Sequence, residues 1–214
     1  MDCAVLRRRM VEEQLAPRGI EDARVLGVFS KVERHRFVPE DFQGSAYADY
    51  PIPIGEGQTI SQPFIVALMT QCLGVSPQDR ILEVGTGSGY QAAILAELAK
   101  EVYTIERIAS LAKRAEVKLS DLGYQNIKIK VDDGTLGWKE NAPFNKIIIT
   151  AASPRIPLPL TEQLAENGRL ILPLGESFSQ VLTLVEKRGN RIESQKICGC
   201  VFVPLVGKYG WKGN

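Results

Sequence analysis

The sequence predicts an α/β fold: a doubly wound, mostly parallel Rossmann-like sheet with an N-terminal helical cap and an antiparallel C-terminal strand pair. Between residues 81 and 172, short apolar runs alternate with helical patterns, which is typical of a parallel sheet covered on both faces. The first apolar run stops at a glycine-rich turn that leads into a helical pattern. Near the end, two apolar runs follow each other without room for a helix, so we expect them to pair antiparallel.

Composition and charge narrow the class of protein. The chain has 214 residues with 44% apolar content, enough for one substantial core, and we expect a single domain that is a monomer. A formal net charge of +1 gives no broad basic surface for nucleic acid, and no uncharged apolar run is long enough to span a membrane. The four cysteines are too scattered for a disulfide framework and lack a matching His/Cys pair for a metal. We therefore expect a cytoplasmic protein without a metal or a nucleic-acid partner.

The N-terminal part predicts helices around a long loop. Residues 4–16 and 22–31 read as two helices, the second of them capped by Asp22. Residues 37–57 are rich in Pro, Gly, Asp and Tyr, which predicts a long ordered loop or a set of short edge strands. A helical spacing then covers residues 63–73, with proline in its first turn.

Strands and helices alternate along the middle of the chain. The predicted strands are near-continuous apolar runs, whereas the predicted helices show an apolar spacing of 3.6 residues. The terminal strand pair, at residues 181–186 and 197–205, would turn at Gly189-Asn190. The other predicted elements are strands at residues 81–84, 102–105, 127–131, 146–150 and 169–172, and helices at residues 90–98, 109–122 and 158–165.

The most informative stretch is RILEVGTGSGY at residues 80–90, where the first strand meets three glycines. Glycine permits positive φ and a close approach of a ligand, and the amides that open the next helix face that ligand. A dinucleotide fingerprint spaces its glycines G-x-G-x-x-G, but here the third glycine comes one residue early and Tyr90 stands in its place. The shorter spacing, with acidic Glu83 just before it, is similar to that of S-adenosylmethionine-dependent methyltransferases and disfavours a nicotinamide-dependent oxidoreductase.

Two further acidic positions follow at the ends of the next two strands. Glu106 ends the second strand, where its carboxylate can accept hydrogen bonds from both ribose hydroxyls of such a cofactor. After the third strand, the carboxylate of Asp133, or alternatively of Asp132, can accept from the adenine amino group. The carboxyl ends of parallel strands share one crevice, so these positions and the glycine turn would face the same ligand. Together with the glycine spacing, this predicts S-adenosylmethionine as cofactor and S-adenosylhomocysteine as product. The expected cofactor-binding residues are Glu83, Gly85, Thr86, Gly87, Ser88, Gly89, Glu106, Asp132, Asp133 and Gly134.

With GQTISQP at residues 57–63 upstream of the glycine turn, the sequence resembles the protein-L-isoaspartate (D-aspartate) O-methyltransferases. The other motifs that carry the resemblance cover nearly the whole chain in the family's order. They are ERHRFVP at residues 33–39, LEVGTGSGY at 82–90, AA at 151–152, LPLG at 172–175 and VFVPL at 201–205. One departure is Asp132, where bacterial relatives usually carry glycine.

The resemblance implies an enzyme of protein repair. Members of this family methylate the α-carboxyl of L-isoaspartyl residues, and the β-carboxyl of D-aspartyl residues, in damaged proteins and peptides. The ester then collapses to a succinimide that can reopen to normal aspartate. The resemblance places the active-site hydroxyl on Ser61. Around it, the expected substrate-binding residues are Thr59, Ile60, Gln62 and Val203.

The domain would then consist of a helical cap and substrate loop over residues 1–75, a cofactor-binding core over 76–175, and C-terminal strands with a tail over 176–214. A carboxylate nucleophile is already ionised at neutral pH and needs no general base, which agrees with a chain that has one histidine.

Several alternatives stay open from the residues alone. Ser61 lies two residues before Pro63, where a hydroxyl often caps a helix. A methyltransferase for another substrate class and an S-adenosylmethionine-binding protein without catalysis are the rival functions. A nucleic-acid amine methylase is disfavoured, because the expected Asn- or Asp-Pro-Pro-aromatic motif is replaced by TAASP at residues 150–154.

Overall fold

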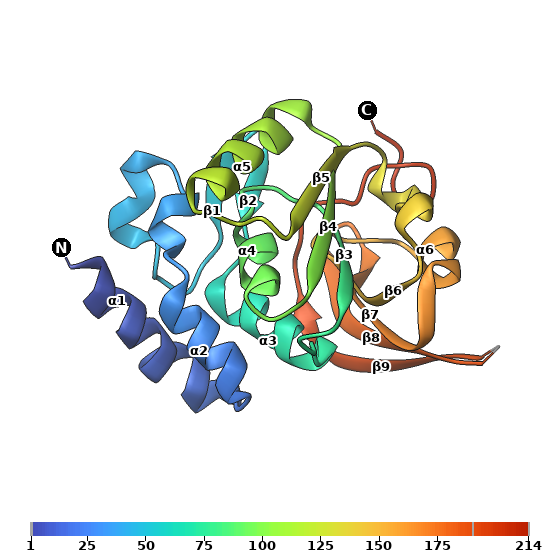
Figure 1. Cartoon of the computed structure of the whole chain (residues 1–214), viewed down its shortest axis with the longest axis horizontal. Coiled ribbons are helices and arrows are strands. Elements are labelled where there is room, and N and C mark those ends of the chain that lie inside the picture. The colour runs from blue at the N-terminus through green and yellow to red at the C-terminus, as the bar shows by residue number, and fades with distance from the viewer. Residues whose placement is uncertain (1, 190, 214) are drawn as a thin grey trace.

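The computed structural model describes residues 2–189 and 191–213, and within these residues the chain is built on a seven-stranded sheet (Figure 1). The strand order is β5-β4-β3-β6-β7-β8-β9. Pairing is parallel from β5 to β7 and antiparallel from β7 to β9, which confirms the predicted fold class. The strands are β3 (Arg80–Val84), β4 (Glu101–Glu106), β5 (Ile127–Val131), β6 (Phe144–Ile149), β7 (Leu164–Glu176), β8 (Ser179–Arg188) and β9 (Arg191–Cys200).

Both faces of the central strands β3, β4 and β6 are buried, as near-continuous apolar strands require. Successive residues of a strand point to opposite faces, so Ile81 and Leu82 join two different hydrophobic clusters. The first cluster includes residues of α3 (Pro63–Leu73), α4 (Tyr90–Ala96) and α5 (Ala109–Asp121). The second includes Leu160 of α6 (Leu158–Glu162) on the opposite side. The helices therefore cover the sheet from both sides.

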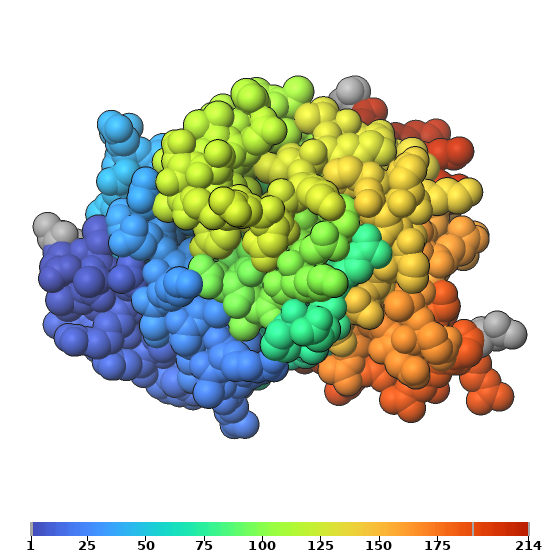
Figure 2. All heavy atoms as spheres, in the orientation of Figure 1, coloured from blue at the N-terminus to red at the C-terminus, as the bar shows by residue number. Residues whose placement is uncertain are grey.

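The N-terminal helices pack beside this core. The first helical segment consists of α1 (Cys3–Arg9), a π-helical stretch over Met10–Leu15 and a short 3₁₀ turn over Ala16–Arg18. In α2 (Ala23–Lys31), the carboxylate of Asp22 accepts from the Arg24 amide at 2.9 Å, which is the predicted cap. Figure 2 shows this part, in blue, at one end of the molecule and the β8–β9 hairpin, in orange and red, at the other. Among the described residues, no helix has both the length and the apolar character to cross a bilayer.

The long loop contains a little regular structure of its own. A 3₁₀ segment spans Glu40–Ser45, and β1 (Ile52–Gly55) pairs antiparallel with β2 (Gln58–Ile60) in a separate two-stranded sheet. Both alternatives predicted for this region therefore occur, since an ordered loop is followed by short strands.

Several predicted boundaries differ from the observed ones, and two predicted elements run at least three residues past their observed ends because tertiary contacts override the local pattern. The helix predicted over residues 158–165 ends at Glu162, since the Phe144 amide bonds to the Gln163 carbonyl at 2.9 Å and draws Leu164 into β7. The strand predicted over residues 197–205 ends at Cys200. Beyond it, Leu205 bonds through its amide to the carbonyl of Ala152 at 2.7 Å, which takes the chain across the carboxyl end of β6. Asn190 of the predicted hairpin turn lies outside the described residues.

One buried cation connects the loop to the segment before α3. Arg34 is fully buried, and its guanidinium donates to the carbonyls of Ala46 and Ser61, each at 2.7 Å. Its Cζ also lies 4.9 Å from the centre of the Tyr90 ring. Burial lowers the pKa of Arg34 to about 10, so the side chain stays charged at neutral pH. It therefore holds the Ser61 main chain against the first residue of α4.

Replacing Arg34 with Ala should lower the free energy of unfolding by about 3 kcal/mol or more, because two carbonyls lose a charged donor at about 1–3 kcal/mol each. Urea unfolding of the ligand-free protein measures this loss. Arg36→Ala is the matched control, since the Arg36 side chain is exposed and its ion pair with Glu33 spans 3.9 Å. The control should change stability by less than about 0.5 kcal/mol. Similar losses in the two variants would contradict the role assigned to Arg34.

Candidate active site

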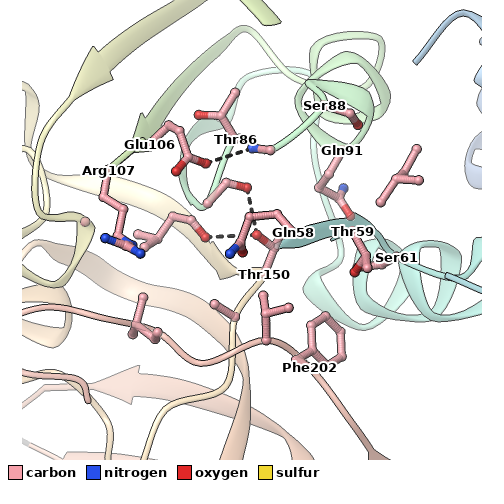
Figure 3. A pocket seen from close by; sticks show the side chains of 18 of the residues that line it. Gln58, Thr59, Ser61, Thr86, Ser88, Gln91, Glu106, Arg107, Thr150 and Phe202 are labelled. Carbon is pink, nitrogen blue, oxygen red and sulfur yellow. Dashed lines mark hydrogen bonds between the residues drawn. The ribbon is translucent and has the colours of Figure 1, made fainter. Parts of the chain in front are cut away.

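A cavity opens at the carboxyl ends of β3, β4 and β6 (Figure 3). The space between its walls is about 880 Å³ when the open solvent at its mouth is included. β2 and α3 form a second wall, and residues 202–206 after β9 form a third. Figure 3 shows Glu106 and Arg107 on one side and Gln91 and Ser61 on the other. Of the three strand ends that the sequence predicts to share one crevice, those of β3 and β4 border this cavity, and the turn after β5 reaches it through Gly134.

The glycine turn after β3 allows a close approach of neighbouring groups. Gly85 has a φ of +100°, and a Cβ there would lie 2.4 Å from the hydroxyl oxygen of Thr150. That hydroxyl donates to the Gly85 carbonyl at 2.7 Å. A Cβ on Gly134 would lie 2.4 Å from the side chain of Val84, the last residue of β3. Side chains at these two glycines would push neighbouring segments apart and change the shape of the cavity.

Glu106 presents a carboxylate that is held by main-chain amides. Its Oε2 accepts from the Gly87 amide at 2.9 Å, and its Oε1 accepts from the Ile108 amide at 3.0 Å. An ionised carboxylate has about four acceptor positions, so each oxygen keeps one for a ligand. Such an arrangement suits two neighbouring hydroxyl groups.

Ser61 lies on the opposite wall, directly before α3. The alternative interpretation of Ser61 as a helix cap is wrong, because the N-cap residue is Gln62 and the Phe64 amide donates to Asp49 at 3.1 Å instead. The Ser61 carbonyl is bound by Arg34. The main chain of Ser61 is thus anchored from behind while its side chain lines the cavity.

The structure brings together most of the predicted site residues. Of the expected cofactor and substrate residues, those that line the cavity are Thr59, Ile60, Ser61, Gly85, Thr86, Gly87, Ser88, Glu106, Gly134 and Val203. Those that lie outside its lining are Gln62, Glu83, Gly89, Asp132 and Asp133.

The residues outside the lining have partners of their own. Asp133 accepts from the amides of Thr135 at 2.9 Å and Lys208 at 2.8 Å, so its carboxylate holds the chain terminus against the turn after β5. Asp132 pairs with Lys130 at 2.6 Å. Gln62 donates to Asp49 at 2.6 Å. These contacts direct the three side chains to protein groups.

Sequence reasoning missed several cavity residues, among them Gln91, Arg107 and Thr150. Gln91 and Arg107 each follow a predicted site residue by one or two positions, so their neighbourhood was the available signal. Thr150 carried no signal, because its role comes from a contact with β3 across the sheet. Within residues 2–189 and 191–213, no group of three or more His, Cys, Asp or Glu side chains is placed to hold a metal ion.

Comparison with known proteins decides the family. A family model described as protein-L-isoaspartate (D-aspartate) O-methyltransferase matches residues 6–210. A protein-L-isoaspartate O-methyltransferase from Syntrophobacter fumaroxidans is 55% identical over 207 residues, which cover 97% of this chain and 97% of that one. The chain belongs to the protein-L-isoaspartate (D-aspartate) O-methyltransferase family. The resemblance inferred from the motifs is thereby confirmed.

Solved structures of this family agree with the fold. A protein-L-isoaspartate O-methyltransferase superimposes with a TM-score of 0.86 at 26% identity, covering 95% of this chain and 67% of that one. A candidate protein-L-isoaspartate O-methyltransferase from Plasmodium falciparum, in complex with S-adenosyl-L-homocysteine, gives a TM-score of 0.81 at 29% identity. That match covers 94% of this chain and 98% of the other. The isoaspartate methyltransferase fold therefore extends over nearly all of this chain.

Glu83 of this methyltransferase lies in β3 just before the glycine turn and is fully buried. The Thr104 hydroxyl donates to its Oε2 at 2.5 Å, while its Oε1 has no hydrogen-bond partner among the described residues. Burial raises the pKa of Glu83 to about 8, the bond from Thr104 opposes this shift, and nearby Glu106 adds to it. Glu83 is therefore mostly protonated at neutral pH.

Glu83 should make the ligand-free enzyme lose stability as the pH rises. Its carboxyl titrates near 4.5 when unfolded and near 8 when folded, so the native state binds the extra proton between these values. This contribution to stability is complete below the unfolded pKa and decreases by up to about 1.4 kcal/mol per pH unit through the window. Glu83→Gln carries no titrating proton and should flatten the decrease. Urea unfolding of both proteins across the window measures it, and parallel pH profiles would contradict it.

Proposed function

We propose that this protein transfers a methyl group from S-adenosylmethionine to the α-carboxyl of L-isoaspartyl residues, and to the β-carboxyl of D-aspartyl residues, in damaged proteins and peptides. The observation that carries the proposal is the position of Ser61, whose side chain faces the cavity across from the glycine turn and Glu106. Family membership supplies the substrate class. The methyl ester would then close to a succinimide that can reopen to normal aspartate, which makes the reaction a repair.

The cavity fits the proposed cofactor. Gly85 and Gly134 line the cavity where a Cβ would push against Thr150 or Val84 and change its shape. The free lone pairs of Glu106 match the two hydroxyls of a ribose. Gly134 lines the side where the adenine would lie, whereas the carboxylates of Asp132 and Asp133 are bound to protein groups. S-adenosylmethionine supplies, when bound, an electrophilic methyl carbon on a sulfonium and leaves as S-adenosylhomocysteine.

The residues of the chain would act mainly by alignment. A substrate carboxylate is ionised at neutral pH, so no group has to remove a proton from it. Ser61 donates one hydrogen bond that orients this carboxylate, and the main chain around Ile60 and Val203 holds the substrate backbone. Correct orientation of two reactants can supply about 7–11 kcal/mol of the barrier reduction. Such a site needs no general base.

The domain organisation, oligomeric state and location of the enzyme are part of the proposal. We propose that the chain works as a monomeric single domain, with a cap and substrate loop over residues 1–75, a cofactor-binding core over 76–175 and terminal strands over 176–214. A cytoplasmic location is supported by four cysteines that are all free. The nearly neutral charge supports a protein substrate over nucleic acid.

Two peptides that differ only in one aspartyl linkage test the proposed function. With methyl-labelled S-adenosylmethionine, the isoaspartyl peptide should acquire a base-labile methyl ester, and the normal peptide should not. Equal labelling of both peptides would indicate another substrate class. No labelling, with the cofactor still bound, would indicate a binding protein without catalysis.

Replacing Ser61 with Ala should lower kcat on the order of 10²-fold, the scale for loss of one orienting donor at a reacting oxygen. The Kd of S-adenosylhomocysteine should stay nearly unchanged, because Ser61 is assigned to the substrate. Ser61→Thr keeps a hydroxyl and should recover part of the rate. Equal losses of turnover and cofactor affinity in Ser61→Ala would contradict this assignment.

A further inference from the structure

Gln91 is a cavity residue whose carboxamide is only half satisfied. Its side chain lines the cavity from the first turn of α4 and is 7% exposed. The Nε2 atom donates to the Thr70 hydroxyl oxygen at 3.2 Å, whereas Oε1 is buried without a hydrogen-bond partner among the described residues. A buried acceptor without a donor costs free energy, so a ligand that brings a donor to this position is favoured.

The orientation of this carboxamide follows from proton counting at Thr70. The Thr70 hydroxyl has one proton, which it donates to the Val66 carbonyl at 2.8 Å within α3. Toward Gln91 this oxygen can therefore only accept, so the NH₂ end of the carboxamide must face Thr70. The oxygen end then points away from Thr70, and Figure 3 shows the Gln91 side chain between Ser88 of the glycine turn and Ser61.

Few donors of the proposed reactants can reach this place. Glu106, which suits the ribose hydroxyls, lies across the cavity from Gln91. The proposed function places the adenine beside Gly134, another lining residue. The methionine end of the cofactor is therefore the part near Gln91, and its donor group is the α-ammonium. The proton of the Ser61 hydroxyl is assigned to the substrate carboxylate. Glu106 is the only carboxylate among the described lining residues, so neutral oxygens have to accept from the ammonium.

We propose that Oε1 of Gln91 accepts a hydrogen bond from the α-ammonium group of the cofactor's methionine moiety, and that Thr70 holds the carboxamide in this orientation. The inference rests on the proposed function, since it assumes that cofactor. It makes Gln91 a cofactor-binding residue and Thr70 a positioning residue. Together they would favour a cofactor whose methionine moiety carries a positively charged α-ammonium group.

Calorimetric binding tests this proposal without any turnover. The ligands are S-adenosylhomocysteine and its deamino analogue, in which 4-mercaptobutanoate replaces homocysteine. Gln91→Met, of similar shape, should weaken S-adenosylhomocysteine roughly 10-fold, which corresponds to about 1.4 kcal/mol. The same variant should bind the deamino analogue nearly as well as the wild type does. Gln91→Glu keeps an acceptor oxygen and should retain most of the affinity for S-adenosylhomocysteine.

Thr70→Val supplies the second variant, because it removes the oxygen that orients Gln91 and leaves the lining of the cavity in place. It should weaken S-adenosylhomocysteine less than Gln91→Met does and leave the deamino analogue unaffected. Thermal unfolding checks that each variant is folded.

Two results would overturn the assignment of Gln91. In one, Gln91→Met weakens both ligands equally. In the other, it leaves both affinities unchanged and raises KM for the isoaspartyl peptide, which would place Gln91 on the substrate. Failure of the wild type to bind S-adenosylhomocysteine at all would overturn the proposed function itself and the inference with it.

Discussion

The site depends on the parallel pairing of β3 with β4 on one side and β6 on the other. The register places Val84 beside Ile105 and Ile149, so the three strands end at the same level. The turn after β3 can then lie against Thr150 and Glu106 through short hydrogen bonds. A shift of one residue would move the side chains of a strand from one packed hydrophobic cluster to the other, where they do not fit, so the register is strongly specified. The shape of the cavity therefore depends on this register.

Two carboxyl groups near the strand ends have different environments. Glu83 points into the core, where one hydroxyl is its hydrogen-bond donor and burial favours the neutral acid. Glu106 receives two main-chain amides and keeps an open side toward the cavity. The first therefore belongs to the interior beneath the turn, and the second is available to a ligand. Their sequence positions, each at the end of a strand, do not distinguish these roles.

The wall of the cavity that carries Ser61 is supported from behind by polar contacts. Arg34 binds the Ser61 carbonyl and stacks near Tyr90, and Tyr90 opens the helix that carries Gln91. Thr70 of α3 in turn orients Gln91. An enzyme that works by alignment needs such supports, because its rate depends on how accurately the donor and the acceptor are placed. Arg34 and Thr70 are such supports.

Much of the architecture was predictable because local rules and apolar periodicity agree with it. The helix at Pro63–Leu73, the strand at Ile127–Val131 and the cap at Asp22 follow from proline position, apolar spacing and a capping side chain. The glycine spacing after β3 and the GQTISQP motif were enough to indicate the family. Such signals lie within a few residues of one another, so a single sequence contains them in full.

Tertiary structure decided what depends on distant partners. Asp133 could bind a ligand or cap a turn by its chemistry. In the structure one of its oxygens caps the local turn at Thr135, and the other accepts from the amide of Lys208, which is distant in sequence. The helix cap at Phe64 comes from Asp49 in the loop, which removes that role from Ser61. The amide orientation of Gln91 is set by a hydroxyl on another helix. A local sequence pattern determines which polar groups are present at a position. Which donors and acceptors those groups bind depends on residues that come close only in the folded chain.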